Sequence, residues 1–98
     1  MFSKLKQFKD LRDQGKKMQS LVAGESATAR AAGDKVVVTL DGSLSMTACA
    51  IDASLLLADN KAKLEEAIKD AHNDALKKIQ RIIAGKMQQS GDFKMPGL

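Results

Sequence analysis

Few side chains in this sequence are of the types that perform acid–base, nucleophilic or metal chemistry. There is one histidine, His72, and one cysteine, Cys49. A catalytic centre or a metal site needs several such groups at defined positions. The sequence also contains no phosphate-binding glycine motif, no nucleophile elbow and no paired metal-ligand spacing. We therefore expect no enzyme activity, no metal, no cofactor and no small-molecule substrate.

Positive charge is the chemistry that the sequence does offer, and it lies at the two ends. The net charge of +4 divides into +4 over residues 1–23, −3 over 24–60 and +3 over 61–98. Lysine contacts phosphate as a point charge, and the absence of Trp and Tyr leaves little that could stack on bases. The pattern predicts an anionic partner held by the two ends of the chain, and a nucleic acid contacted through its phosphate backbone is one hypothesis. The candidate DNA-binding residues are Lys4, Lys6, Lys9, Arg12, Lys16, Lys17, Lys77, Lys78, Arg81 and Lys86.

Other hypotheses fit the same residues. Lysines of this kind are also typical of a solvated helix surface, and those late in the last helix suit the negative end of its dipole. The alternative function is a dimeric interaction protein that binds another protein through apolar helix faces and exposed Met18, Met46 and Met87. A weaker hypothesis is attachment of the first helix to an anionic membrane surface. No apolar run approaches the ~20 residues that span a bilayer, and we expect no membrane partner.

Two helices are predicted at the ends of the chain. Apolar residues recur three or four apart over residues 2–22, the spacing of one helical face. A stronger stripe runs from Leu64 to Ile83, within a helix expected over 60–88. At 1.5 Å per residue this helix reaches ~40 Å, which is longer than a three-stranded sheet can cover. Part of it must therefore project or meet another helix.

An antiparallel sheet is predicted between the helices, over residues 24–52. Val36 to Leu40 is β-branched or apolar throughout, and Asp41-Gly42 predicts a hairpin in which Gly42 supplies the positive φ. Glu25 to Ala32 alternates polar and small residues and reads as a weak edge strand or as a loop. Cys49 lies on the same side of the return strand as Ile51 and is expected to be a small buried hydrophobic residue. A single cysteine cannot form an internal disulfide, which fits a reducing cytosol.

Both faces of this sheet are apolar in the sequence pattern. A three-stranded antiparallel sheet normally has one face exposed to solvent. We therefore expect one face to pack on the helices of this chain and the other on a second subunit. The predicted dimer interface consists of Val37, Met46, Ala48 and Ala50.

Four segments carry a resemblance to a known family. They are VVVTLDG (36–42), AIDASLL (50–56), AHNDALKKI (71–79) and FKMP (93–96). Together they resemble the YbaB/EbfC family of bacterial nucleoid-associated proteins, although Ala53 stands where that family usually has proline. The resemblance implies an α+β fold with an α-β-β-β-α subunit, and a homodimer with helices projecting like the arms of tweezers. It also implies binding of double-stranded DNA with little or modest sequence preference, in the cytoplasm at the nucleoid.

The expected organisation is thus a single domain over residues 1–98. It has an N-terminal helix over 1–22, a three-stranded antiparallel sheet over 24–52, a long C-terminal helix over 60–88 and a flexible tail over 89–98.

Overall fold

The computed structural model describes residues 2–90. Its elements in chain order are α1 (Phe2–Val22), β1 (Ser26–Ala31), β2 (Val36–Asp41), β3 (Met46–Ile51), the short 3₁₀ helices η1 (Ala53–Leu55) and η2 (Ala58–Asn60), and α2 (Lys61–Ser90). The predicted α+β class and α-β-β-β-α order are confirmed. Gln89 and Ser90, assigned above to the tail, belong to α2, and the rest of the predicted tail lies outside the described residues.

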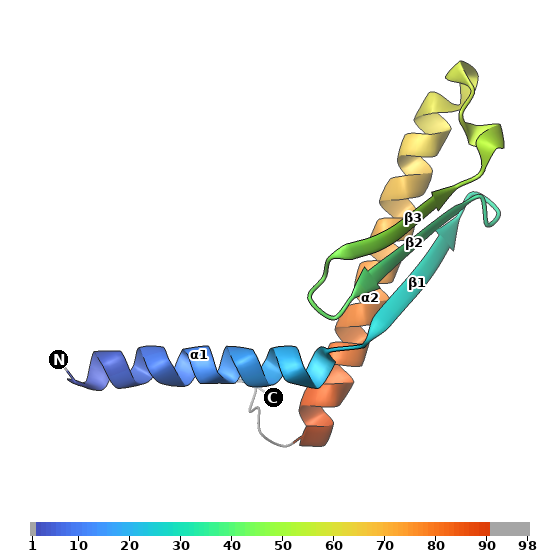
Figure 1. Cartoon of the computed structure of the whole chain (residues 1–98). Helices are drawn as coiled ribbons and strands as arrows, with labels where there is room; N and C mark the ends of the chain where they lie inside the picture. Colours follow the sequence, from blue (N-terminus) through green and yellow to red (C-terminus); the bar gives the residue numbers. More distant parts are fainter. Residues whose placement is uncertain (1, 91–98) are drawn as a thin grey trace.

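The three strands form one antiparallel sheet in the order β1-β2-β3, and α2 crosses one face of it (Figure 1). The helix packs mainly over β1 and β2. Helix α1 extends away from the sheet like an arm and meets α2 only near its own C-terminal end (Figure 1). The chain therefore has an elongated outline, 61 × 29 × 25 Å.

The core lies between β2 and α2. Val36, Val38 and Leu40 alternate along β2 on the side facing α2, and all three are fully buried. Opposite them, α2 contributes Ala71, Ala75 and Ile79, also fully buried. Small alanine side chains at four-residue spacing let the helix approach the sheet closely, which compensates for the lack of large aromatic side chains in this core.

Strand β3 corrects one prediction made from the sequence. Cys49 does pair with Val38, which is buried, but Cys49 itself is exposed. The reason is that α2 covers β1 and β2 and leaves β3 largely uncovered, so every residue of β3 before Ile51 is exposed. The alternation in the sequence identified the side of the strand correctly but could not show how far the helix reaches across the sheet.

The turn between β2 and β3 corrects a second prediction. The hairpin is present, but the positive φ falls at Leu44 (68°) and not at Gly42. Asp41 organises the turn: its Oδ1 accepts hydrogen bonds from the Ser43 amide (2.9 Å), the Ser43 hydroxyl (2.7 Å) and the Ser45 amide (3.0 Å). These bonds close a longer turn than the two-residue one expected from Asp-Gly.

Gly42 is required for a different reason. A Cβ at this position would overlap the carbonyl oxygen of Val22 and lie 2.9 Å from the Val22 Cβ. Val22, at the end of α1, is itself buried. The absence of a side chain at Gly42 therefore lets the turn seat the last residue of α1, and Gly24 (φ 84°) then redirects the chain into β1.

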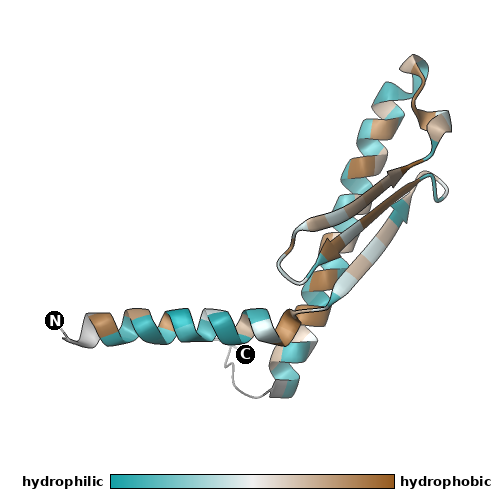
Figure 2. Cartoon of the chain, viewed as in Figure 1, coloured by the Kyte–Doolittle hydropathy of each residue, from teal (hydrophilic) through white to brown (hydrophobic). Residues whose placement is uncertain are grey.

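The part of α2 that extends beyond the sheet meets the end of α1, as the length of its apolar stripe required. The rest of α1 stands clear, and its apolar residues alternate with polar ones along the arm (Figure 2). Leu5, Phe8 and Leu11 are 71%, 73% and 67% exposed. The amphipathic pattern of α1 was therefore predicted correctly, but within residues 2–90 nothing covers the apolar face that Leu5, Phe8 and Leu11 form.

Candidate nucleic-acid interface

The first group of predicted cations lies along the α1 arm. Lys6, Lys9, Arg12, Lys16 and Lys17 are all exposed. None of the five forms a hydrogen bond or an ion pair through its side chain with the described part of the chain. Lys4 lies in α1 as well, but its side chain is outside the description. The arm thus presents an excess of cations to solvent, only partly offset by Asp10 and Asp13, and such an excess favours contact with an anionic polymer.

The second group lies in the C-terminal half of α2 and divides into two kinds. Lys77 and Arg81 are exposed, and within residues 2–90 their side chains have no bonded partner. Lys78 donates a hydrogen bond from Nζ to the Thr28 carbonyl of β1 (3.0 Å). Lys86 Nζ lies 3.3 Å from Glu25 Oε1, with 40% of the lysine side chain exposed. Lys78 and Lys86 therefore already serve the packing of α2 beside β1.

Helical spacing explains this division. A helix turns once every 3.6 residues, so Lys78 and Lys86 fall beside the buried stripe of Ala75 and Ile79, whereas Lys77 lies on the far side of the helix. A count of charge alone does not distinguish the four cations, because it ignores the position of each one relative to this stripe. Their spacing from Ala75 and Ile79 was the signal that could have separated them.

The two groups are not brought together into one site within the chain. Helices α1 and α2 meet at the end of α1, and from there the α1 arm leads its cations away from the sheet (Figure 1). A ligand that contacts both the α2 cations and those at the far end of α1 must therefore extend along the arm.

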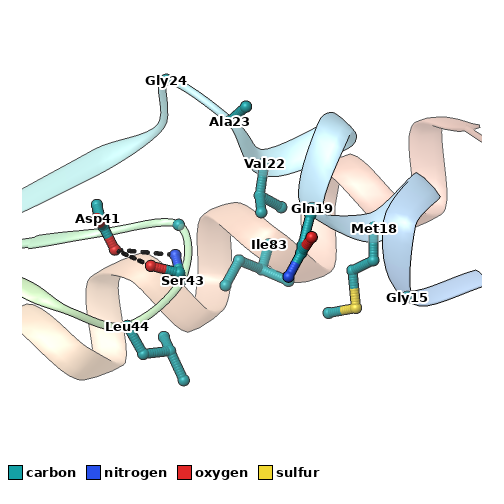
Figure 3. A pocket seen from close by; sticks show the side chains of 11 residues that line it. Gly15, Met18, Gln19, Val22, Ala23, Gly24, Asp41, Ser43, Leu44 and Ile83 are labelled. Carbon is teal, nitrogen blue, oxygen red and sulfur yellow. Dashed lines mark hydrogen bonds between the residues drawn. The ribbon is translucent and has the colours of Figure 1, made fainter. Parts of the chain in front are cut away.

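A groove of about 580 Å³ lies at the junction of the two helices (Figure 3). Met18 and Val22 of α1, Leu44 of the β2–β3 turn and Ile83 of α2 supply its apolar walls. Asp41 lines it and no lysine or arginine does. Hydrogen bonds from Ser43 and Ser45 lower the pKa of the Asp41 carboxyl below its ordinary value, so this group stays ionised at neutral pH. The groove is unsuited to phosphate.

The predicted dimer-interface residues are placed unequally. Val37 pairs with Ala50, and Thr39 with Ala48, so Val37, Ala48 and Ala50 share the face turned away from α2. Met46 departs from this alternation, because a bulge at Thr39/Leu40 brings it opposite Leu40. Arg30 pairs with Val37 from β1 and is exposed, so this face becomes polar toward β1.

Between residues 2 and 90, no three or more His, Cys, Asp or Glu side chains are grouped so as to hold a metal ion. Within the same range, no helix has the length and apolar character needed to cross a membrane.

Comparison with known proteins tests the resemblance carried by the four sequence segments. The model of the YbaB/EbfC DNA-binding family matches residues 1–92. The chain belongs to the YbaB/EbfC DNA-binding family. The family match covers α1, the sheet and all of α2, and so includes both groups of exposed cations.

Relatives of this YbaB/EbfC chain carry names in keeping with the family. A nucleoid-associated protein of Brucella ovis is 40% identical over 88 residues, which is 90% of this chain and 82% of the relative. A nucleoid-associated protein of Brucella canis matches with the same values. The crystal structure of an uncharacterized protein from Helicobacter pylori shares the fold, with a TM-score of 0.64 at 18% identity, over 87% of this chain and 95% of that one.

Proposed function

We propose that this YbaB/EbfC chain is a single-domain, non-enzymatic nucleoid-associated protein that binds double-stranded DNA as a homodimer. The single observation that carries the proposal is the family match over residues 1–92, which includes two sets of exposed cations. The relatives named nucleoid-associated proteins support the same assignment.

Contact with DNA runs through the phosphate backbone in this proposal. On α1 the contacts come from Lys4, Lys6, Lys9, Arg12, Lys16 and Lys17, and on α2 from Lys77, Lys78, Arg81 and Lys86. Lys77 and Arg81 contribute most of the α2 share, because Lys78 and Lys86 are engaged with Thr28 and Glu25. Long cationic side chains with no stacking Trp or Tyr beside them favour backbone contact and little sequence specificity.

The unequal edges of the sheet support dimerisation. Edge strand β1 is tied to α2 through the Lys78–Thr28 hydrogen bond, and Lys86 pairs with Glu25 just before it. No hydrogen bond or ion pair joins β3 to α2 in the described part of the chain, and β3 is exposed on both faces. An exposed, uncharged edge strand pairs readily with another chain. The second copy therefore meets β3 with Ala48 and Ala50 at the interface, together with Val37 and Met46.

The protein-binding alternative keeps one observation in its favour, the exposed apolar face of α1. The methionines that it relied on support it less, because Met18 and Met87 are half-buried. A pull-down with the Lys77→Glu, Lys78→Glu and Arg81→Glu triple variant separates the two functions. DNA binding is lost under the proposal made here, and capture of a protein partner is retained under the alternative.

Titration of a fluorescent duplex at several salt concentrations tests the proposal. The logarithm of the binding constant should fall linearly with the logarithm of salt concentration, with a slope of about −0.9 per phosphate neutralised. A duplex of unrelated sequence and equal length should bind with similar affinity. Binding that does not respond to salt, or no binding at low salt, contradicts the proposal.

A further inference from the structure

Three apolar surfaces in the described chain have no covering partner. The first is the α1 stripe of Leu5, Phe8 and Leu11, and the second is strand β3. The third is the pair Leu56 and Leu57, each 64% exposed, in the link between η1 and η2. Exposed large apolar side chains in groups of this kind mark interaction surfaces.

The link that carries Leu56 and Leu57 is held in a fixed shape. Leu55, the residue before them, is buried in the core. Asp52 Oδ1 accepts a hydrogen bond from the Ser54 amide (2.9 Å), and Asn60 Nδ2 donates to the Ser54 carbonyl (2.9 Å). The two exposed leucines are therefore presented to solvent by an anchored backbone.

Antiparallel pairing of two β3 strands brings these surfaces together. Such pairing sets the Met46 end of one strand beside the Ile51 end of the other. The base of α1 lies at the Met46 end, because Met18 and Val22 share the junction groove with Leu44 (Figure 3). Leu56 and Leu57 lie just beyond the Ile51 end. Each α1 arm therefore leaves the junction beside the leucine pair of the other copy.

From these positions we propose that the apolar stripe of α1 packs on Leu56 and Leu57 of a second copy, so that each arm clasps its partner. The inference rests on the homodimer proposed above and adds α1 to its interface. A two-fold symmetric dimer uses the same surfaces of both copies, so each contact occurs twice. One such arrangement covers the α1 stripe, strand β3 and the leucine pair in both copies.

The charges of α1 and of the region around Leu56 and Leu57 are opposite in sign, which favours a second copy as the partner of α1. Residues 1–23, which contain α1, carry +4, and residues 24–60 carry −3. Asp52 and Asp59 flank the leucine pair, and Arg12 lies one position from Leu11 on the arm. Lys6 and Lys17 lie on the face of α1 opposite Phe8, because at 3.6 residues per turn both are rotated by about half a turn around the helix axis from it. These lysines stay available to DNA while the stripe faces the second copy.

Disulfide trapping tests the contact between copies. In a Cys49→Ser background, Leu11→Cys is combined with Leu57→Cys, and oxidation is followed on a mixture of isotopically light and heavy chains. Both positions are more than 60% exposed in the single chain, so the fold should tolerate the changes. The matched control combines Leu57→Cys with Asp13→Cys on the opposite face of α1. We expect a covalent dimer linking residues 11 and 57 between light and heavy chains, formed at least about tenfold faster than in the control.

The outcomes separate this inference from the homodimer itself. Equal, slow trapping of both pairs in a sample whose mass is twice that of the chain overturns the arm contact and leaves the homodimer standing. A sample with the mass of a single chain overturns both. As a second measurement, Phe8→Glu should raise the dimer dissociation constant about tenfold or more, a change of at least about 1.4 kcal/mol. Lys6→Glu on the opposite face should leave it within about threefold, and equal effects of the two would contradict the inference.

Discussion

Gly42 lies against Val22 so closely that the β2–β3 turn and the end of α1 leave no room for a side chain between them. A Cβ at Gly42 would overlap the Val22 carbonyl oxygen and approach the Val22 Cγ2 to 2.9 Å. Val22 is buried and α1 has few other contacts with the rest of the chain. This contact therefore helps to set the direction in which the arm leaves the sheet.

Gly42→Ala should destabilise the protein by about 1–3 kcal/mol, because the methyl group must displace main-chain atoms of Val22. Chemical denaturation followed by circular dichroism measures the change. Gly85→Ala is the matched control: apart from its chain neighbours and the adjacent backbone of α2, no described atom lies within 4 Å of its added Cβ, and alanine in a helix should stabilise by about 0.5–1 kcal/mol. If Gly42→Ala is as stable as the wild type, the close contact is not what positions α1.

Truncation of the core residue Ile79 should lower the stability of the protein more than Gly42→Ala does. Ile79 is fully buried between α2 and the sheet, so Ile79→Ala should lower the free energy of unfolding by about 2–5 kcal/mol. Gln80→Ala, at an exposed position of the same helix, should change the stability by less than about 1 kcal/mol. Comparable losses in the two variants would show that the assignment of the core is wrong.

Acid should weaken the β2–β3 turn. The Ser43 hydroxyl and the amides of Ser45 and Ser43 donate to Asp41, and these bonds lower the pKa of its carboxyl below the ordinary 3.8. The unfolded chain therefore binds a proton at higher pH than the folded chain does. The contribution of Asp41 to stability is fully present above the ordinary pKa and is lost as the pH falls through the lower, folded value.

Urea denaturation between pH 6 and pH 2 measures this loss, and Asp41→Asn should reduce its steepness. Asp52 behaves in the same sense, since the Ser54 amide and hydroxyl lower its pKa. Asp59→Asn serves as a control on an exposed side chain. An Asp41→Asn variant with the pH dependence of the wild type would show that these hydrogen bonds do not act on stability.

Charge reversal on α2 should weaken DNA binding according to position. Lys77→Glu with Arg81→Glu removes two exposed, unengaged cations from each copy, so the salt slope should decrease in magnitude by about 2 for each copy that contacts the duplex, and the affinity at low salt should fall roughly tenfold or more. Lys61→Glu with Lys63→Glu makes the same charge change in the acidic half of α2 and should have a smaller effect. Fluorescence anisotropy on one duplex compares the two variants. Equal losses would mean that net charge governs binding, with no role for position.

Much of the fold could be predicted from local patterns in the sequence. The apolar stripe on α2, the β-branched run of β2 and the Asp41-Gly42 hairpin each follow from nearest-neighbour chemistry, and the structure has the α-β-β-β-α order they imply. The two predictions that were wrong, on Cys49 and Gly42, concern contacts with segments distant in the sequence. Cys49 is exposed because α2 stops short of β3, and Gly42 is needed because Val22 lies against it. Neither relation is visible within a few residues of sequence.

The candidate site was predicted at the level of helices but not of single side chains. The charge pattern placed cations on α1 and α2, and the exposed lysines of α1 agree with it. Whether a lysine is free or engaged depends on which carbonyl or carboxylate lies within its reach after folding. Lys78 reaches Thr28 across 50 positions of sequence, and Lys86 reaches Glu25. Such pairings are set by how the helix is seated on the sheet.

Light scattering on one purified sample, before and after addition of duplex DNA, tests the central claim most directly. The chain has a mass of 10.5 kDa, and the account predicts twice that mass without DNA and a larger complex with it, which dissociates as salt is raised. A mass of 10.5 kDa without DNA, or an unchanged mass after duplex is added at low salt, would contradict the account.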